Sequence, residues 1–189
     1  MIYLASASPR RRELLTQIGI EFELLKVDVD ESRLGEESPD VHVARLAQLK
    51  ATTAADLVQK PWPVLGSDTI VVSEGEILGK PADKAAAIST LQKLSGKTHQ
   101  VKTAICVVFN GKPHTEVVTT QVTFRELSLS EIEQYWASGE PADKAGSYGI
   151  QGIAGKFVKT INGSYSSVVG LPLMETERLI HQLSGNQAI

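Results

Sequence analysis

The amino-acid sequence predicts an α/β protein, and two observations carry this prediction. Short runs rich in Val, Ile and Thr alternate with stretches rich in Ala, Leu and Lys whose apolar residues recur at helical spacing. Hydrophobic residues make up 42% of the 189 residues and charged residues 22%, which is typical of a folded chain rather than a disordered one. At about 150 residues per domain, this length fits one domain or one domain with two lobes.

The first half of the chain is expected to alternate between strands and helices. Its clearest helix has Ser8 as N-cap, Pro9 at the first helical position and Gly19 after the last turn. In order, we expect a strand at 2–5, this helix, a strand at 21–27, a helix from 38 to about 58, a strand at 63–72 and a tight turn at 74–75 into 77–78.

The second half is expected to contain a β-hairpin between two helices, then a closing strand and helix. Asn110-Gly111 is the strongest hairpin signal in the chain, and Ser130 with Glu133 three residues later predicts a capping box. The expected elements are a helix at 83–94, strands at 98–109 and 115–124, a helix at 130–137, a strand at 157–161 and a helix at 173–183.

Composition and charge argue against several classes of protein. The 19 Lys and Arg against 22 Asp and Glu give a net charge of −3, whereas a dedicated nucleic-acid binder usually has a basic excess. The longest apolar run without Gly or Pro covers residues 104–109, far short of the roughly 18 residues of a membrane span. No secretory signal is visible, and the single Cys106 cannot form an internal disulfide. We therefore expect a cytoplasmic protein with no nucleic-acid and no membrane partner.

Residues 8–12, Ser-Pro-Arg-Arg-Arg, are a candidate anion site at a helix start. The first amide N–H groups of a helix lack partners and its dipole is positive there, so clustered arginines oppose the helix unless an anion compensates them. A polyphosphate would do so, because the guanidinium group grips phosphate oxygens through a rigid fork of donors. The alternative is a solvated basic face, or ion pairs with Glu13, Asp28 or Asp30, and these residues alone do not decide between the two.

A second candidate site centres on Asp68, which interrupts the apolar strand at 63–72. Aspartate is depleted in strands, and a desolvated carboxylate needs a cation. Lys50 and Lys80 could supply the cation and Glu31 a second carboxylate, although single lysines and acidic loops are more often simply solvated. Together these residues suit nucleoside triphosphate hydrolysis, in which cations neutralise phosphates, a carboxylate activates water and a divalent ion assists.

Ordered motifs along nearly the whole chain resemble the Maf family, the septum-formation-inhibitor-like nucleotide pyrophosphatases. The first is Ala-Ser-Ala-Ser-Pro-Arg-Arg-Arg-Glu-Leu-Leu at residues 5–15. The others are Leu-Ala-Gln-Leu-Lys-Ala at 46–51, Gly-Ser-Asp-Thr at 66–69, Gly-Lys-Pro at 79–81, Asp-Lys-Ala-Gly-Ser-Tyr-Gly-Ile-Gln-Gly at 143–152 and Asn-Gly-Ser-Tyr to Val-Gly-Leu-Pro across 162–172. The resemblance implies a single two-lobed domain over residues 1–189, with an elongated mixed β-sheet flanked by helices, a central nucleotide-binding cleft, an inosine-triphosphatase-like fold and a homodimer.

The resemblance also implies a role for each candidate residue. Asp68 matches the general base, and Glu31 matches an acidic position that, with Asp68, serves a divalent metal such as Mg²⁺ or Mn²⁺. Family members cleave between the α and β phosphates and release a monophosphate and pyrophosphate. The implied phosphate-binding set is Ser8, Arg10, Lys50 and Lys80.

Three positions imply which base is read. Arg11, Thr69 and Gln151 agree with the branch that acts on dTTP and UTP, whereas the 7-methyl-GTP branch typically has Trp after the Ser-Pro, Gln after the Asp and Glu in the later loop. A Gln amide both donates and accepts, which matches the N3–H and carbonyls of uracil or thymine; alternatively, Gln151 is a loop residue bonded to its own backbone. Two other functions stay open: a nucleotide-binding regulator of cell division without essential catalysis, and a pyrophosphatase directed at 7-methyl-GTP or another purine.

Overall fold

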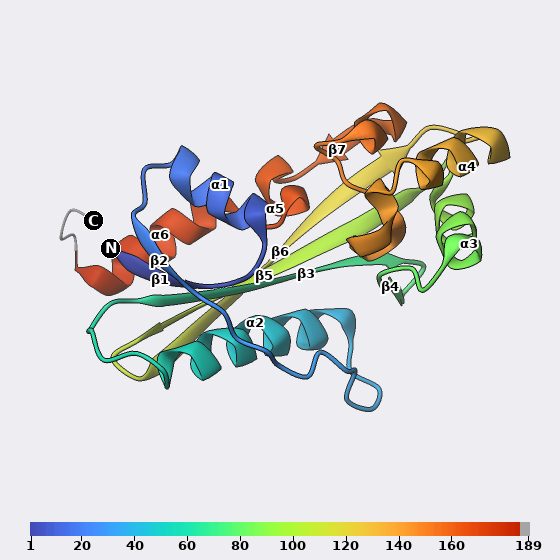
Figure 1. Cartoon of the computed structure of the whole chain (residues 1–189). Helices are drawn as coiled ribbons and strands as arrows, with labels where there is room; N and C mark the ends of the chain where they lie inside the picture. Colours follow the sequence, from blue (N-terminus) through green and yellow to red (C-terminus); the bar gives the residue numbers. More distant parts are fainter. Residues whose placement is uncertain (186–189) are drawn as a thin grey trace. The chain divides into compact units, whose positions relative to one another are not determined.

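The computed structural model describes residues 1–185, and its elements confirm the α/β prediction (Figure 1). The strands are β1 (Ile2–Ala5), β2 (Phe22–Leu25), β3 (Val64–Ser73), β4 (Glu76–Leu78), β5 (Thr98–Phe109), β6 (Lys112–Phe124) and β7 (Val158–Asn162). The α-helices are α1 (Pro9–Gln17), α2 (Pro39–Ala55), α3 (Lys84–Leu94), α4 (Leu129–Ala137), α5 (Tyr165–Val169) and α6 (Leu173–Ser184).

The strands of the described residues form one mixed sheet, as the resemblance implies. Its order is β2-β1-β3-β5-β6-β7, and β4 pairs with β3 at the side of this path. Strand β1 runs parallel to both β2 and β3, whereas the β3–β4 and β6–β7 pairs are antiparallel. Parallel neighbours need a crossover, and α1 and α2 supply the two crossovers at the start of the chain.

The chain divides into two compact units that share strands β3, β5 and β6. The first unit comprises residues 1–68, 103–118 and those from 170 onward, and the second comprises 69–102 and 119–169. The boundary between the two units falls between Asp68 and Thr69, so the predicted site residues are distributed over both units.

The core of the first unit surrounds the short strand β1, all four residues of which are buried. Figure 1 shows α2 on one face of β1 and α1 with α6 on the opposite face. The register places Ala5, the last residue of β1, beside Gly66 of β3. The chain segments that follow Ala5 and Gly66 therefore emerge side by side, and these segments carry Ser8 and Asp68.

The core of the second unit is rich in aromatic rings. Phe124 meets the ring of Tyr148 edge-on at 4.8 Å between centroids, and Tyr135 meets Phe157 in the same way at 5.2 Å. Helices α3 and α4 pack against each other in this unit. The buried residues of the cluster are Val71, Leu78, Leu91, Leu94, Val101, Val122, Phe124, Ile132, Tyr135, Tyr148, Ala154 and Phe157.

The prediction of the α4 capping box was wrong by two residues. Ser128, not Ser130, is the N-cap, and it exchanges hydrogen bonds with Glu131 rather than Glu133. Both serines have a glutamate three residues later, so the pattern fits two frames equally. In the observed frame Glu131 both completes the capping box and binds Arg125, with 2.6 Å between Arg125 Nη2 and Glu131 Oε1. In the other frame Glu133 would be the capping glutamate instead.

Other local predictions were confirmed in part. Asn110 and Gly111 both have positive φ, of 50° and 72°, as a tight hairpin turn requires, but β6 begins at Lys112 rather than at 115. The 3-10 helices at Glu140–Asp143, Ala145–Ser147 and Ile153–Phe157, together with α5, were not expected. No helix among the described residues is long and apolar enough to span a bilayer.

Candidate active site

The segment between β1 and α1 is held by a network around Ser6. The Ser6 hydroxyl accepts hydrogen bonds from the Ser8 N–H at 3.1 Å and from Arg11 Nη1 at 3.4 Å. Arg11 Nε donates to the carbonyl oxygen of Gly170 at 2.8 Å. Ser8 is the N-cap residue of α1, but its side chain makes no capping hydrogen bond to the helix. Ser8, Arg10 and Arg11 are thus placed together at one helix start.

Electrostatics connect Arg11 to both predicted carboxylates. Burial lowers the pKa of Arg11, and the positive charge of Arg10 lowers it further. The negative charges of Asp68 and Glu31 act in the opposite direction and raise the pKa. These influences place the guanidinium within electrostatic range of both acidic side chains. Arg11 therefore lies close enough to Asp68 and Glu31 for their charges to interact, and the membership of Arg10 and Arg11 in one site with them stays a prediction.

At the centre of this site, Lys50 joins two carboxylates. Its Nζ lies 2.7 Å from Asp68 Oδ1 and 2.6 Å from Glu31 Oε1. The side chains of Lys50 and Asp68 are 13% and 11% exposed, whereas that of Glu31 is 51% exposed. A buried carboxylate is thereby paired with its cation, and the second carboxylate faces solvent where a charged ligand can approach.

Small residues bring Lys50 to Asp68. A Cβ atom at Gly66 would lie 2.5 Å from the carbonyl oxygen of Ala47 and 2.7 Å from the backbone nitrogen of Ala51, so only glycine lets α2 approach β3 this closely. Lys50 precedes Ala51 on the helix, and Asp68 lies two residues after Gly66 on the strand. The close packing of α2 on β3 therefore brings the backbones of Lys50 and Asp68 near each other.

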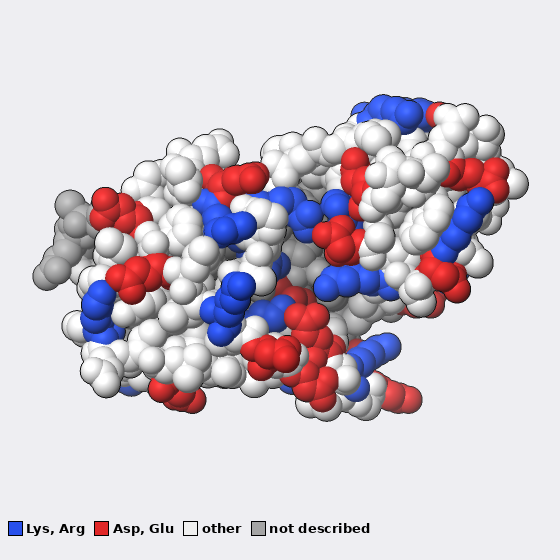
Figure 2. Space-filling model, viewed as in Figure 1, with Lys and Arg blue, Asp and Glu red and all other residues white. Residues whose placement is uncertain are grey.

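A salt-bridge cluster fixes the segment that carries Glu31. Arg45 of α2 donates through Nε to Glu37 Oε1 at 2.6 Å and through Nη2 to the carbonyl oxygen of Ser32 at 2.9 Å. Ser32 follows Glu31 directly, so this contact holds the backbone beside the carboxylate. Figure 2 shows acidic side chains gathered where this segment, between β2 and α2, lies.

The remaining predicted residues belong to the second unit. Thr69 is half-buried on β3 and follows Asp68 directly. Lys80 is exposed in the turn between β4 and α3, and the carbonyl oxygen of Gly79 beside it accepts a hydrogen bond from Gly146 at 3.1 Å. Gln151 is exposed in a turn that follows Tyr148. The first unit therefore brings Ser8, Arg10, Arg11, Glu31, Lys50 and Asp68 together, and the second unit carries Thr69, Lys80 and Gln151.

Comparison with known proteins identifies the family of the chain. The family described as Maf-like protein matches residues 1–183. The chain belongs to the Maf-like family. A dTTP/UTP pyrophosphatase of Pseudoalteromonas translucida is 57% identical over 179 residues, which are 95% of each chain. Proteins of the same name from Aliivibrio fischeri and Vibrio cholerae are 54% and 55% identical, each over 96% of this chain and 97% of the relative. The Staphylococcus aureus Ham1 protein, a solved structure, is 20% identical with a TM-score of 0.45, over 67% of this chain and 71% of that one.

The donor set of this Maf-like site fits a divalent cation that is shared with a phosphate ligand. Within residues 1–185, no three His, Cys, Asp or Glu side chains are arranged to hold a metal ion by themselves. Mg²⁺, however, usually needs only one or two carboxylates, since waters and phosphate oxygens complete its octahedron. Asp68 and Glu31 each place an oxygen within 2.7 Å of one ammonium nitrogen, so both can reach a single cation.

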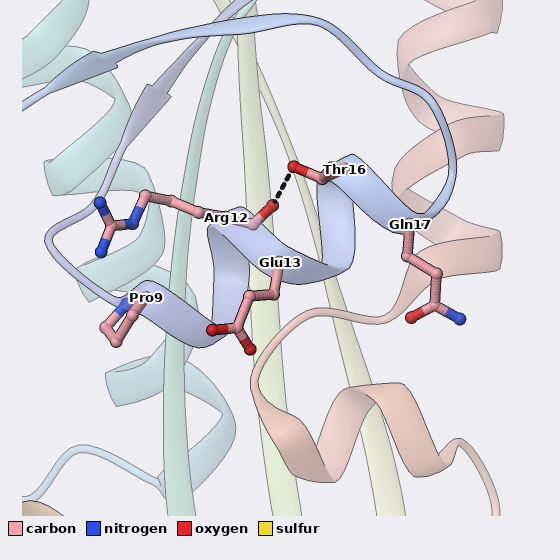
Figure 3. A pocket seen from close by; sticks show the side chains of 5 residues that line it. All are labelled: Pro9, Arg12, Glu13, Thr16 and Gln17. Carbon is pink, nitrogen blue, oxygen red and sulfur yellow. Dashed lines mark hydrogen bonds between the residues drawn. The ribbon is translucent and has the colours of Figure 1, made fainter.

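The pocket of about 460 Å³ in Figure 3 includes Pro9 and Arg12 from the start of α1 but none of the residues assigned to the phosphates, the metal or the base. It is lined by Pro9, Arg12, Glu13, Thr16 and Gln17, which follow one face of α1. Figure 3 shows these side chains on a single helix, with the Thr16 hydroxyl bonded to the carbonyl oxygen of Arg12 at 3.0 Å. A surface formed by one helix does not exclude water, so this pocket is not a candidate for the chemistry.

Sequence reasoning missed three residues that support the Maf-like site. Gly170 accepts hydrogen bonds from Arg11 and from Ser67, the latter at 3.2 Å, and so ties α1 to β3. Its place in the Val-Gly-Leu-Pro motif was a usable signal. Arg45 and Glu37 carried no such sequence signal. They are eight residues apart, one on a helix and one on a loop, and no local pattern predicts the path of that loop.

The Glu37–Arg45 pair predicts how acid affects this part of the molecule. Its hydrogen bond with Arg45 lowers the pKa of Glu37 from 4.5 to about 2. A lowered pKa in the folded state stabilises the fold above the ordinary pKa, and the stabilisation is lost as pH falls from about 4.5 to about 2. We expect the difference in unfolding free energy between wild type and Glu37→Gln to be constant at neutral pH and to vanish near pH 2. Urea denaturation at a series of pH values measures it; a difference independent of pH would contradict the assignment.

Proposed function

We propose that this Maf-like protein hydrolyses dTTP and UTP to the nucleoside monophosphate and pyrophosphate. The observation that carries the proposal is the convergence of Asp68 and Glu31 on Lys50, beside the arginines that begin α1. Phosphoryl transfer from a triphosphate requires cations that neutralise the phosphates and a group that can accept a proton from the attacking water. Relatives named dTTP/UTP pyrophosphatase, 52–57% identical over 94–96% of this chain, support the choice of substrate.

In the proposed reaction Asp68 is the general base. Its carboxylate takes a proton from a water molecule, whose oxygen attacks the α phosphorus, and the bond from that phosphorus to the bridging oxygen breaks. Pyrophosphate leaves with the electron pair of that bond. Ser8, Arg10, Lys50 and Lys80 bind the phosphates. The positive charges of Arg10, Lys50 and Lys80 reduce the cost of the charge that develops on the leaving group, and the Ser8 hydroxyl donates a hydrogen bond.

The proposal includes a divalent cation, Mg²⁺ or Mn²⁺, held by Asp68 and Glu31 together with phosphate oxygens. When bound, such an ion neutralises triphosphate charge and orients the phosphates. Base recognition is assigned to Arg11, Thr69 and Gln151. The single two-lobed domain over residues 1–189, the homodimer and the cytoplasmic location stay predictions from the sequence.

A nucleotide panel tests the proposal. With Mg²⁺ or Mn²⁺, we expect kcat/KM for dTTP and UTP to exceed that for GTP and 7-methyl-GTP by about 100-fold, since polar groups left unpaired by the wrong base are costly. The products, separated by ion-exchange chromatography, should be the monophosphate and pyrophosphate in equal amounts. Release of orthophosphate would refute the cleavage position, and a preference for 7-methyl-GTP would assign the protein to the purine-directed class instead.

A further inference from the structure

The turn that carries Gln151 is fixed at its backbone while the Gln151 side chain is exposed. The N–H of Gly152 donates to the carbonyl oxygen of Gly149 at 3.1 Å and closes the turn. Ile150 is partly buried against the aromatic core of the second unit. The residue before Gln151 is thus anchored by packing, and the residue after it by a hydrogen bond. A side chain on such a turn is presented to a ligand in a restricted region of space.

Two side chains from outside the turn hold both of its ends. The hydroxyl of Tyr135, on α4, accepts a hydrogen bond from the Gly149 N–H at 3.1 Å and donates to Glu140 Oε1 at 2.8 Å. The other oxygen of that carboxylate, Oε2, accepts from the Ile153 N–H at 2.9 Å. Tyr135 and Glu140 therefore form a bridge from the first to the last residue of the segment 149–153, and Gln151 lies at its centre.

The space beside this bridge explains the glycine that follows Gln151. A Cβ atom at Gly152 would lie 2.3 Å from Glu140 Oε2, closer than any real contact of this kind. Lys144 supports the bridge from the other side, since its Nζ donates to the Glu140 carbonyl oxygen at 2.8 Å. Tyr135 is 2% exposed, and its ring packs edge-on against Phe157. The Tyr135 end of the bridge is thus anchored in the core of the second unit, whereas the hydrogen bond from Ile153 to Glu140 lies at the surface.

We infer that Tyr135 and Glu140 are positioning residues for base recognition: they set where Gln151 is presented, and thereby the preference for pyrimidine over purine nucleotides. The inference rests on the proposed function, because it assumes that Gln151 reads the base. It goes beyond that proposal by assigning specificity to two residues on α4 and in the segment after it. Neither of them is required to touch the nucleotide.

The test compares Tyr135→Phe and Glu140→Gln with a matched control, Glu131→Gln. The control removes a carboxylate from the same helix, where Glu131 caps α4 and binds Arg125 but does not touch the turn. We expect the UTP-to-GTP ratio of kcat/KM to fall about tenfold in both bridge variants, because a small misplacement of a recognition group is costly. The fall in this ratio should arise from a higher KM for UTP, with kcat for UTP changed less than about twofold. The control should keep the wild-type ratio.

Hydrogen exchange gives a readout that is independent of turnover. We expect the Gly149 amide to exchange faster in Tyr135→Phe, and the Ile153 amide faster in Glu140→Gln, with both unchanged in Glu131→Gln. If Glu140→Gln fails to fold, Tyr135→Phe decides the matter, since it keeps the ring packed on Phe157. Wild-type ratios in a folded Tyr135→Phe variant would overturn the inference alone. A wild-type protein that hydrolyses neither UTP nor dTTP would overturn the proposed function, and the inference with it.

Discussion

Replacement of Asp68 by asparagine is expected to reduce pyrophosphate release by about 10²–10⁴-fold, the usual contribution of a general base. Asparagine has nearly the same shape as aspartate and keeps an oxygen that can accept a hydrogen bond from Lys50. In the wild-type protein the Lys50 Nζ lies 2.7 Å from Asp68 Oδ1. Asparagine cannot take a proton from water. Because the side chains of Arg10, Lys50 and Lys80 are unchanged and Glu31 keeps its carboxylate for the divalent cation, we expect the dissociation constant for dTTP or UTP to change far less than turnover.

Turnover and binding must therefore be measured on the same Asp68→Asn preparation, by product release and by calorimetry. Glu23→Gln is a suitable control, because it also removes a carboxylate that pairs with a lysine, Lys60 at 2.9 Å, but on an exposed surface outside the site. Near wild-type turnover in Asp68→Asn would remove Asp68 from the role of base. Equal rescue of a division phenotype by wild type and Asp68→Asn would favour the regulator.

The parts of the site that could be predicted from sequence depend on strong local signals. Asp68 was found because a carboxylate in an apolar strand needs a partner. The helix start at residues 8–12 was found because adjacent cations oppose the helix dipole. In both cases the conflict lies between a residue and its immediate neighbours, so the sequence alone marks these positions as candidates, and the family resemblance then assigns their roles.

The supporting contacts could not be predicted, because their members are joined only by the folded chain. Glu37 reaches Arg45 from a loop, and Glu140 reaches Ile153 across 13 residues without regular periodicity. The 3-10 helices between 140 and 157 have the same origin, since their backbone follows Gly146 and the contacts of Glu140 rather than an amphipathic pattern. The residues proposed to bind the nucleotide thus carried local sequence signals, whereas the residues that hold them in place did not.

Replacement of Gly66 by alanine is expected to have the largest effect on stability among the changes considered, and it also tests how Lys50 is positioned. The new Cβ would meet the carbonyl oxygen of Ala47 at 2.5 Å and the backbone nitrogen of Ala51 at 2.7 Å. Backbone atoms of a helix cannot rotate away as a side chain can, so α2 must move from β3. Overpacking of this kind costs about 1–3 kcal/mol, and occasionally more.

The same movement should separate Lys50 from Asp68, because both residues lie within two positions of the contact. A displacement on the order of 1 Å at a catalytic pair costs about 10²-fold in rate, so the folded fraction of Gly66→Ala should turn over slowly as well as unfold easily. Gly79→Ala is the stability control, since nothing lies within 4 Å of a Cβ there and its φ is not positive. Urea denaturation and turnover per folded molecule measure the two effects separately. If Gly66→Ala keeps the wild-type stability but its folded molecules turn over slowly, the position of α2 matters to the chemistry alone. If both stability and turnover keep their wild-type values, the close approach of helix and strand is contradicted.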